Sequence, residues 1–300
     1  MKYNPLGHSD LLVSEVSFGC MSLGEDQTQN DTMLQQAFNQ GITLFDTADL
    51  YQQGQNEISV GKAFKGMRHQ VIIATKVGNQ WRADGSGWDW NPRMAYIIQA
   101  VEESLKRLQT GYIDLYQLHG GTLDDPIDEI IETFELLKLQ GKIRHYGISS
   151  IRPNVIREYV NRSNITSVMM QYSLLDRRPE ESCLDLLHQH QIGVLARGSL
   201  AKGLLVNKPA AAYGNYSPEE VAQAAKAIRL LANQMQTTTG VAIQFALRHP
   251  AVTSAVVGIR TLEQLAACIQ ASQDMVMPLT EEEIRSLAAA LPIKFYEEHR

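Results

Sequence analysis

Eight short apolar runs, each followed by a longer segment of helical periodicity, constrain the fold of this 300-residue chain more than any other feature. Strand-length runs rich in Val, Ile and Leu that alternate with helical segments are typical of βα units and a parallel sheet. The predicted strands are Val16 to Gly19, Thr43 to Asp46, Val71 to Thr75, Ile113 to Leu118, Tyr146 to Ile148, Ser167 to Gln171, Gly193 to Ala196 and Ser254 to Val257. The pattern therefore predicts an α/β fold.

A right-handed βα unit repeated eight times in a chain of this length can close as a (β/α)8 TIM barrel. The competing fold is a doubly wound sheet, which commonly carries G-x-G-x-x-G after its first strand, and that motif is missing here. Gly19 with Gly24, and Gly198 with Gly203, match the glycine spacing of a phosphate loop but lack its K-[ST]. Because no linker-like stretch interrupts the pattern, we predict one barrel domain over residues 1–300.

Capping residues predict where several helices begin and end. We expect Asp31 to begin the first helix, Gly41 to end it, and Asn154 to cap the segment VIREYVNR. In IDEIIETFELLKLQGK, apolar residues stand at 127, 130, 131, 134, 137 and 139, mostly three or four apart, and Gly141 follows as a stop. This helix should pack one face on the sheet.

Two kinds of segment lie outside the eight pairs. The N-terminal stretch KYNPLGHSDLLVS, with turn residues Gly7 and Asp10, predicts a hairpin that plugs one end of a barrel. Residues 79–91 and 198–217 are long and polar and follow strands, so both should lie over the C-terminal face. Trp81, Trp88 and Trp90 all fall in the first of these loops. Tryptophan in a polar loop usually covers apolar groups, and we expect Trp81 and Trp88 to contact a substrate.

Composition and charge exclude several kinds of partner. The net charge is -6, whereas nucleic acid is bound by clustered Lys and Arg, so we expect no nucleic-acid partner. The sequence shows neither a signal-peptide pattern nor an apolar run of the roughly 18 residues that cross a bilayer, which predicts a cytoplasmic protein without membrane contact. Cys20, Cys183 and Cys268 lie far apart, as expected for reduced thiols. A small-molecule partner is expected, and a monomer and a homo-oligomer are equally compatible with the sequence.

Ionisable side chains follow three neighbouring predicted strands. Asp46 ends the second strand, Lys76 follows the third and His119 follows the fourth, while Tyr51 comes five residues after Asp46. Ionisable groups are costly at the edge of a packed barrel unless they have partners, and a barrel brings its strand ends together. Taken singly, each has an ordinary interpretation as a loop cap, a rim charge, a core histidine or a surface aromatic. Their convergence at one face predicts an active site.

This cluster suits proton donation to a carbonyl oxygen. A free tyrosine has a pKa of about 10, and a nearby ammonium stabilises the phenolate, so we expect Lys76 to lower the pKa of Tyr51. Asp46 would keep Lys76 ionised in spite of burial. A neutral His119 could hydrogen-bond the substrate oxygen and orient it.

With these residues in place, the chain resembles the aldo-keto reductase superfamily over nearly its whole length, in particular the bacterial branch related to general stress reductases and potassium-channel beta subunits. The stretches that carry the resemblance are FDTADLYQQGQNE, IIATKVG, LYQLH, GKIRHYGIS, MMQYSLLDR and VVGIRTLEQL. The resemblance implies a TIM barrel that uses NADPH, with Asp46, Tyr51 as proton donor, Lys76 and His119 as the catalytic residues.

The same resemblance implies a cofactor site. Ser149, Ser150 and Gln171 would hold the nicotinamide carboxamide, Arg260 would grip the adenosine 2'-phosphate at a helix start, and Gln264 would face the adenine. The residues expected to contact NADPH or NADP+ are Gly19, Cys20, Met21, Asp46, Ser149, Ser150, Gln171, Arg197, Gly198, Ser199, Leu200, Gly203, Gly258, Arg260 and Gln264.

The chain departs from the family pattern at several of these positions. Ser150 replaces an asparagine, Cys268 also stands where an asparagine is common, and Arg197 stands where many members have an aromatic residue. Arginine can stack on the nicotinamide or reach a phosphate. Gly120 and Gly121 follow His119 where bulkier residues are frequent, which suggests a wider substrate mouth.

The predicted function is NADPH-dependent reduction of an aldehyde or ketone, and three alternatives stand beside it. A Schiff-base lyase would use Lys76 as nucleophile, which requires a neutral amine. An NADPH-binding sensor or regulatory protein would show slow turnover and tight cofactor retention. A metal hydrolase would use His188, His190 and Asp185, but the two histidines diverge on a helix, so no metal is expected.

Overall fold

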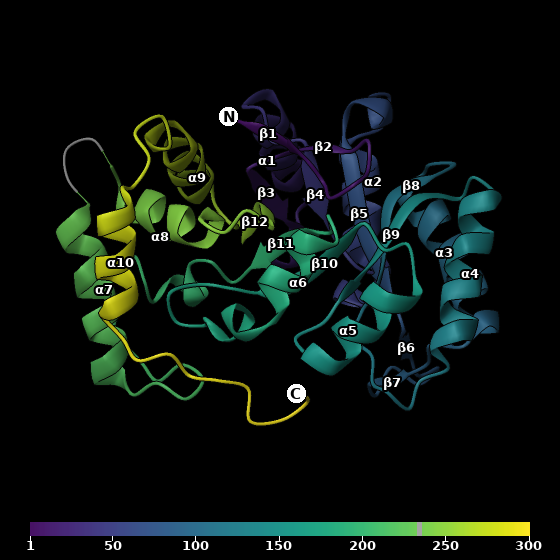
Figure 1. Cartoon of the computed structure of the whole chain (residues 1–300). Coiled ribbons are helices and arrows are strands. Elements are labelled where there is room, and N and C mark those ends of the chain that lie inside the picture. The colour runs from purple at the N-terminus through teal and green to yellow at the C-terminus, as the bar shows by residue number, and fades with distance from the viewer. Residues whose placement is uncertain (233–235) are drawn as a thin grey trace.

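The computed structural model describes residues 1–232 and 236–300, and its centre is a closed barrel of eight parallel strands (Figure 1). Around the barrel the order is β10, β11, β12, β3, β4, β5, β8 and β9, and β9 pairs with β10 to close it. The strands are β3 (Val16–Gly19), β4 (Leu44–Asp46), β5 (Ile72–Val77), β8 (Ile113–Leu118), β9 (Ile143–Ser149), β10 (Ser167–Gln171), β11 (Gly193–Arg197) and β12 (Val252–Gly258). The predicted TIM barrel is confirmed.

Helices surround the barrel and cover the outer face of its strands (Figure 1). They are α1 (Gln27–Asn39), α2 (Gln55–Ala63), α3 (Met94–Leu108), α4 (Ile127–Leu139), α5 (Pro153–Arg162), α6 (Cys183–Gln189), α7 (Pro218–Leu231), α8 (Thr238–Leu247), α9 (Leu262–Asp274) and α10 (Glu281–Ala289). Strands covered on both faces are mostly apolar, but β8 buries all six of its residues, including the polar Asp114 and Gln117. Among the described residues, no helix combines the length and apolarity needed to cross a membrane.

The N-terminal hairpin closes one end of the barrel, as its sequence predicts. Strands β1 (Tyr3–Pro5) and β2 (Leu12–Ser14) pair antiparallel. Leu6, Leu11 and Val13 are buried in one cluster with residues from six barrel strands, including Leu115 and Leu195. Burial of such side chains stabilises the fold by about 1.5–3 kcal/mol each. Because β2 leads directly into the start of β3, the hairpin lies at the N-terminal end of the barrel strands.

Two predicted helix starts are wrong. Helix α1 begins at Gln27 because the side chain of Asp26, and not that of Asp31, accepts hydrogen bonds from two first-turn amides. Helix α5 begins at Pro153, whose fixed φ suits the first helical position, so Asn154 lies inside the first turn.

Other differences arise from contacts that local patterns do not contain. Leu139 is 87% exposed and contributes nothing to the core face of α4. Strand β9 begins three residues before Tyr146, because Ile143 pairs with Ile113 of β8. The predicted loop 79–91 holds a second hairpin, β6 (Asn79–Trp81) with β7 (Trp88–Trp90), whose strands pair antiparallel.

Candidate active site

A cavity of about 1190 Å³ opens at the C-terminal ends of the barrel strands. Its walls include Asp46, Tyr51, Lys76 and His119, the four residues predicted from the strand ends. In barrels of this type, side chains at the C-terminal ends of the strands form the active site. The structure therefore brings the four predicted catalytic side chains into one cavity.

Lys76 lies at the centre of this group. Its Nζ atom is 2.8 Å from Oδ2 of Asp46, 2.6 Å from the backbone oxygen of Thr47 and 3.4 Å from the Tyr51 hydroxyl. Lys76 is 1% exposed and Asp46 is 4% exposed. Three oxygen partners satisfy the three N–H donors of the ammonium, so a charged lysine can persist in a buried position.

The chain between Asp46 and Glu57 is shaped to return Tyr51 to the cavity. After β4 a short 3-10 turn spans Tyr51–Gly54, in which Gln52 and Gln53 have φ values of 51° and 54°. Gly54 follows with φ of +86°. Three successive residues with positive φ reverse the chain sharply, and α2 begins at once at Gln55. This reversal is why a tyrosine so close to a strand end lies on neither a strand nor a long helix.

A buried carboxylate anchors the end of this segment. Glu57 is fully buried, its Oε2 atom is 2.7 Å from Nε of Arg107, and the Thr75 hydroxyl donates to its Oε1 atom at 2.6 Å. Glu57 lies on α2, Arg107 lies on α3, and Thr75 immediately precedes Lys76. Glu57 therefore connects both helices to the residue next to Lys76. A paired and hydrogen-bonded carboxylate is stable in a buried position, whereas an unpaired one is not.

Lys76 and Asp46 each stabilise the charged form of the other. Burial acts to lower the pKa of Lys76, but the carboxylate of Asp46 and the hydroxyl of Tyr51 outweigh it, and the pKa of Lys76 is raised. Burial raises the pKa of Asp46, and Lys76 opposes that rise. At neutral pH the lysine is therefore an ammonium ion.

The expected lowering of the Tyr51 pKa is wrong. Burial raises the pKa of Tyr51, and although Lys76 lowers it, the net direction is upward. Desolvation of the phenolate exceeds the attraction of one ammonium that Asp46 already partly neutralises. Tyr51 therefore holds its proton across the neutral range, and Lys76 limits the rise of its pKa.

His119 faces Tyr51 edge to face, with the ring centroids 5.9 Å apart. Burial, followed by the charges of Lys76 and Arg197, lowers the pKa of His119 to about 3. Its Nδ1 atom is buried and has no hydrogen-bond partner among the described residues. A neutral imidazole with a free ring nitrogen can orient a polar ligand atom by hydrogen bonding.

Most of the residues predicted to bind a cofactor line the same cavity. These are Gly19, Met21, Asp46, Ser149, Ser150, Gln171, Arg197, Gly198, Ser199, Leu200, Gly203, Gly258, Arg260 and Gln264. Cys20 is fully buried and is not part of the wall. Trp88 lines the cavity, but Trp81 does not, and the Trp81 indole donates to the Leu50 backbone oxygen at 3.2 Å.

Several lining residues were missed by the sequence interpretation. Trp90 lines the wall in place of Trp81 and donates to Asp125 at 2.8 Å. Tyr213 accepts a hydrogen bond from the Gln171 amide at 2.6 Å. Further lining residues without a predicted role are Asn79, Arg152, Lys202, Asn207, Lys208 and Thr239. The lysines stand in a predicted C-terminal-face loop, and that position was the available signal for them.

The cavity wall is strongly basic for an acidic protein. Its described lining residues include six with Lys or Arg side chains and a single carboxylate, that of Asp46. Lys202, Lys208 and Arg260 come from the loops after β11 and β12, and Arg260 directly precedes the N-cap of α9. Basic side chains beside a helix N-terminus favour phosphate groups. The cavity therefore fits an elongated ligand with several phosphates.

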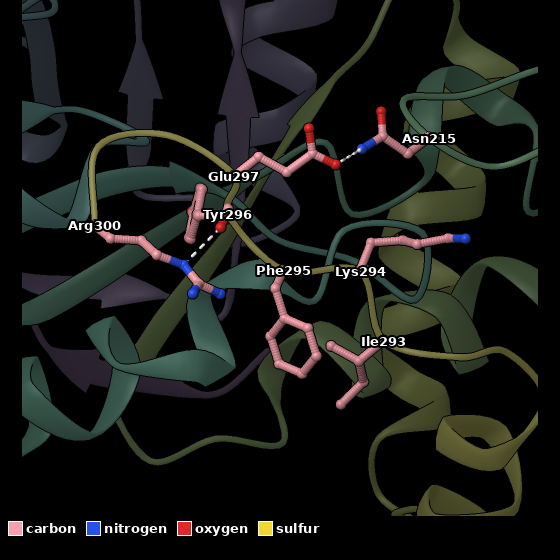
Figure 2. A pocket seen from close by; sticks show the side chains of 7 residues that line it. All are labelled: Asn215, Ile293, Lys294, Phe295, Tyr296, Glu297 and Arg300. Atoms are coloured by element: carbon pink, nitrogen blue, oxygen red, sulfur yellow. Dashed lines mark hydrogen bonds between the residues drawn. The ribbon is translucent and has the colours of Figure 1, made fainter.

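A second, smaller cavity of about 460 Å³ lies under the C-terminal tail (Figure 2). In Figure 2 the side chain of Arg300 turns back to the Tyr296 backbone oxygen, at 2.7 Å, and Glu297 meets Asn215, at 3.4 Å. None of the four predicted catalytic residues lines it. The lining of this second cavity therefore does not indicate a second active site.

Comparisons with known proteins agree with this geometry. The sequence model of the Aldo/keto reductase family matches residues 15–292. The Bacillus subtilis (strain 168) protein named "Uncharacterized oxidoreductase YqkF" is 51% identical over 100% of both chains. The Escherichia coli (strain K12) "NADH-specific methylglyoxal reductase" is 34% identical over 68% of this chain and 69% of its own length. The solved structure of aldo-keto reductase AKR11C1 from Bacillus halodurans in its holo form superimposes with a TM-score of 0.94 at 50% identity, covering 100% of this chain and 99% of the other.

Proposed function

Because the chain belongs to the aldo/keto reductase family, whose members are oxidoreductases that act on carbonyl compounds with a nicotinamide cofactor, we propose that it reduces aldehydes or ketones to alcohols with NADPH. The observation that best supports this proposal is that Lys76 contacts both Asp46 and the Tyr51 hydroxyl inside one cavity. Reduced nicotinamide supplies the hydride in this chemistry. The tyrosine supplies the proton.

Tyr51 is proposed as the proton donor because it combines a retained proton with a nearby positive charge. The raised pKa keeps the phenol protonated, and the ammonium 3.4 Å away stabilises the phenolate as the proton leaves. His119 is neutral and would orient the carbonyl oxygen through a ring N–H. Asp46 would hold the lysine charged and in position.

The cofactor proposal rests on the distribution of polar groups along the cavity. Ser149, Ser150 and Gln171 would bind the carboxamide end, close to the catalytic group, and Arg197 lies beside Gln171 with Nη1 3.2 Å from its amide oxygen. At the far end Arg260 would bind the 2'-phosphate that distinguishes NADPH from NADH. The choice of NADPH depends on Arg260, since one relative is named as NADH-specific.

The alternatives fit the geometry less well. A Schiff-base lyase needs a neutral Lys76, and Asp46 and Tyr51 raise the pKa of that amine. A nucleotide sensor would not require a proton donor beside the ammonium. We also propose that residues 1–300 form one domain, because the barrel closes only when β9 pairs with β10, and a single cooperative unfolding transition would support this.

The test follows nicotinamide absorbance with the purified protein, NADPH or NADH in turn, and a panel of aldehydes, ketones and quinones. Tyr51→Phe should bind NADPH with unchanged affinity and lose carbonyl reduction by about 100- to 10,000-fold. Tyr3→Phe, a change at a 45% exposed tyrosine on the opposite hairpin, is the matched control. A Tyr51→Phe variant that reduces carbonyls at the original rate would refute the assigned proton donor.

A further inference from the structure

Arg152 occupies the substrate side of the cavity. It follows β9 and precedes α5, lines the cavity, and is only partly exposed. Its Nη1 atom donates to the backbone oxygen of Gly121 at 2.6 Å. Gly121 is two residues after His119, so the Cα atoms of these two residues are ~7 Å apart at most, and the guanidinium contacts the segment that directly follows His119.

The other basic residues of the wall already have neighbours or a role in the proposed cofactor site. Lys76 pairs with Asp46, and Arg197 donates to Gln171. Lys202, Lys208 and Arg260 come from the loops after β11 and β12, where the phosphates of the proposed cofactor would lie. Strand β9, which leads to Arg152, instead pairs with β8, whose end carries His119. Arg152 is therefore the basic side chain placed beside the catalytic imidazole and away from the phosphate side.

The charge of Arg152 is not neutralised within the described part of the chain. No carboxylate there forms an ion pair with its guanidinium, which donates to the backbone oxygen of Gly121. The neighbouring acid Asp125 already accepts from Trp90 Nε1 at 2.8 Å and from the Thr122 amide at 2.6 Å. A guanidinium has five N–H donors in a planar fork, so several remain for a ligand.

Apolar surface frames this unpaired cation. Trp88 and Trp90 line the same cavity from the β6–β7 hairpin, and Ile151 lines it next to Arg152. Gly120 and Gly121 add no side chains between the cation and His119. A ligand with an apolar body and one anionic end would satisfy both features of this wall.

We infer that Arg152 binds the carboxylate of a substrate that carries both a reactive carbonyl and a carboxylate, so that the physiological substrate is an oxo acid. This inference rests on the proposed carbonyl reduction and names its substrate class. One guanidinium matches one carboxylate in charge and in its paired N–H to oxygen geometry. A phosphate ester, which carries up to two charges, would leave one charge uncompensated beside the apolar wall.

A purely structural role for Arg152 makes a different prediction. Its bond to Gly121 could serve only to hold the turn in which Gly120 and Gly121 have φ values of +140° and +122°. Loss of such a brace would disturb His119 and reduce turnover of every carbonyl compound to the same extent. Loss of a substrate contact would affect only substrates that carry the anion.

The experiment compares 4-carboxybenzaldehyde with the neutral, similarly shaped 4-formylbenzamide as substrates of the full chain with NADPH. The unchanged protein should favour the acid. Arg152→Gln should lower kcat/KM about 10- to 100-fold for the acid and less than about 3-fold for the amide. Arg152→Lys, which keeps the charge, should recover part of the difference, and Arg157→Gln, a change on α5 away from the cavity wall, should alter neither substrate.

Benzoate inhibition of 4-formylbenzamide reduction supplies a second readout, and Arg152→Gln should raise its inhibition constant by a similar factor. Equal losses for acid and amide would overturn the inference in favour of a structural brace. No preference for the acid in the unchanged protein, with normal reduction of the amide, would overturn the inference and leave carbonyl reduction intact. Failure to reduce any aldehyde would refute the proposed function and this inference together.

Discussion

The Nζ atom of Lys76 lies 2.8 Å from Oδ2 of Asp46 in a position where both side chains are almost fully buried. The pair connects the ends of β4 and β5, which are neighbours in the barrel. Pairing two charges out of water contributes little net stability, whereas removing one partner leaves the other unpaired. The ion pair is therefore better explained by the proposed reaction, in which it would keep an ammonium beside Tyr51, than by folding.

A double-mutant cycle on this pair should show strong coupling. Asp46→Asn and Lys76→Met should each lower the free energy of unfolding by about 3–5 kcal/mol, and the double variant should lose less than their sum. Each single variant should also reduce carbonyl reduction at least about 100-fold. Urea unfolding and the nicotinamide assay measure the two effects. The exposed pair of Lys106 and Glu103 is the control and should couple by less than about 1 kcal/mol.

The low pKa of His119 predicts how stability changes with pH. The folded protein holds a neutral imidazole down to about pH 3, whereas an unfolded histidine titrates at 6.5. The unfolded state therefore binds more protons between these values, and stability falls as the pH is lowered through this window. Between pH 7 and pH 5 this one group should remove about 2 kcal/mol. Above pH 6.5 the neutral His119 makes its full contribution to the free energy of unfolding, and raising the pH further removes none of it.

Urea unfolding of the original protein and of His119→Gln at pH 7, 6 and 5 measures this slope. The variant should lose about 2 kcal/mol less than the original protein over that range. His69→Gln, a change at an exposed histidine before β5, is the control and should keep the original slope. Identical slopes for the original protein and His119→Gln would show that the imidazole is not held neutral by burial.

The sequence predicted the barrel and the meeting of the four strand-end residues because both follow from strand position. Buried parallel strands are mostly apolar, and a closed barrel places the C-terminal ends of all its strands at one rim. The direction of the Tyr51 pKa could not be predicted in this way, because it depends on how far burial outweighs one ammonium. The N-cap at Asp26 was missed because Asp26 and Asp31 are equally good caps by residue type, and only the fold selects between them.

Residues contributed by loops were harder to predict than those on strands. Trp81 pairs with Trp88, and Trp90 lies two residues further along the same strand, so the register places all three on one face of the hairpin. Contacts beyond the hairpin, such as the bond from the Trp81 indole to Leu50, decide which of them line the cavity. Arg152 lies at the mouth because Gly121 accepts its hydrogen bond, a contact between segments 31 residues apart. No local pattern contains such a contact.

Glu57 should be among the most sensitive positions outside the cavity. It is fully buried and pairs with Arg107 at 2.7 Å, so Glu57→Gln leaves the arginine charge without its partner. We expect a loss of about 3–5 kcal/mol in the free energy of unfolding. Glu158→Gln, which breaks an exposed pair with Arg162 on α5, should cost about 0.5 kcal/mol or less. Equal effects in urea unfolding would mean that the Glu57 site is not buried as described.

Arg260 should decide between the two nicotinamide cofactors. Its backbone N–H donates to the Gln264 side chain at 2.8 Å, which fixes the turn before α9, and its exposed side chain lines the cavity. A guanidinium that binds the 2'-phosphate contributes about 1.5–3 kcal/mol through charge-assisted hydrogen bonds, so Arg260→Ala should weaken NADPH binding about 10- to 150-fold. NADH lacks this phosphate, and its affinity should change less than about 3-fold.

Fluorescence titration of each cofactor separates these two losses without any carbonyl substrate. Arg285→Ala removes an exposed arginine from α10, outside the cavity wall, and should leave both affinities unchanged. Raising the salt concentration should weaken NADPH binding to the original protein more than to Arg260→Ala, because salt screens a charge pair that the variant no longer has. Equal losses for NADPH and NADH in Arg260→Ala would place the 2'-phosphate elsewhere, with Lys202 and Lys208 as the remaining basic side chains on that side of the cavity.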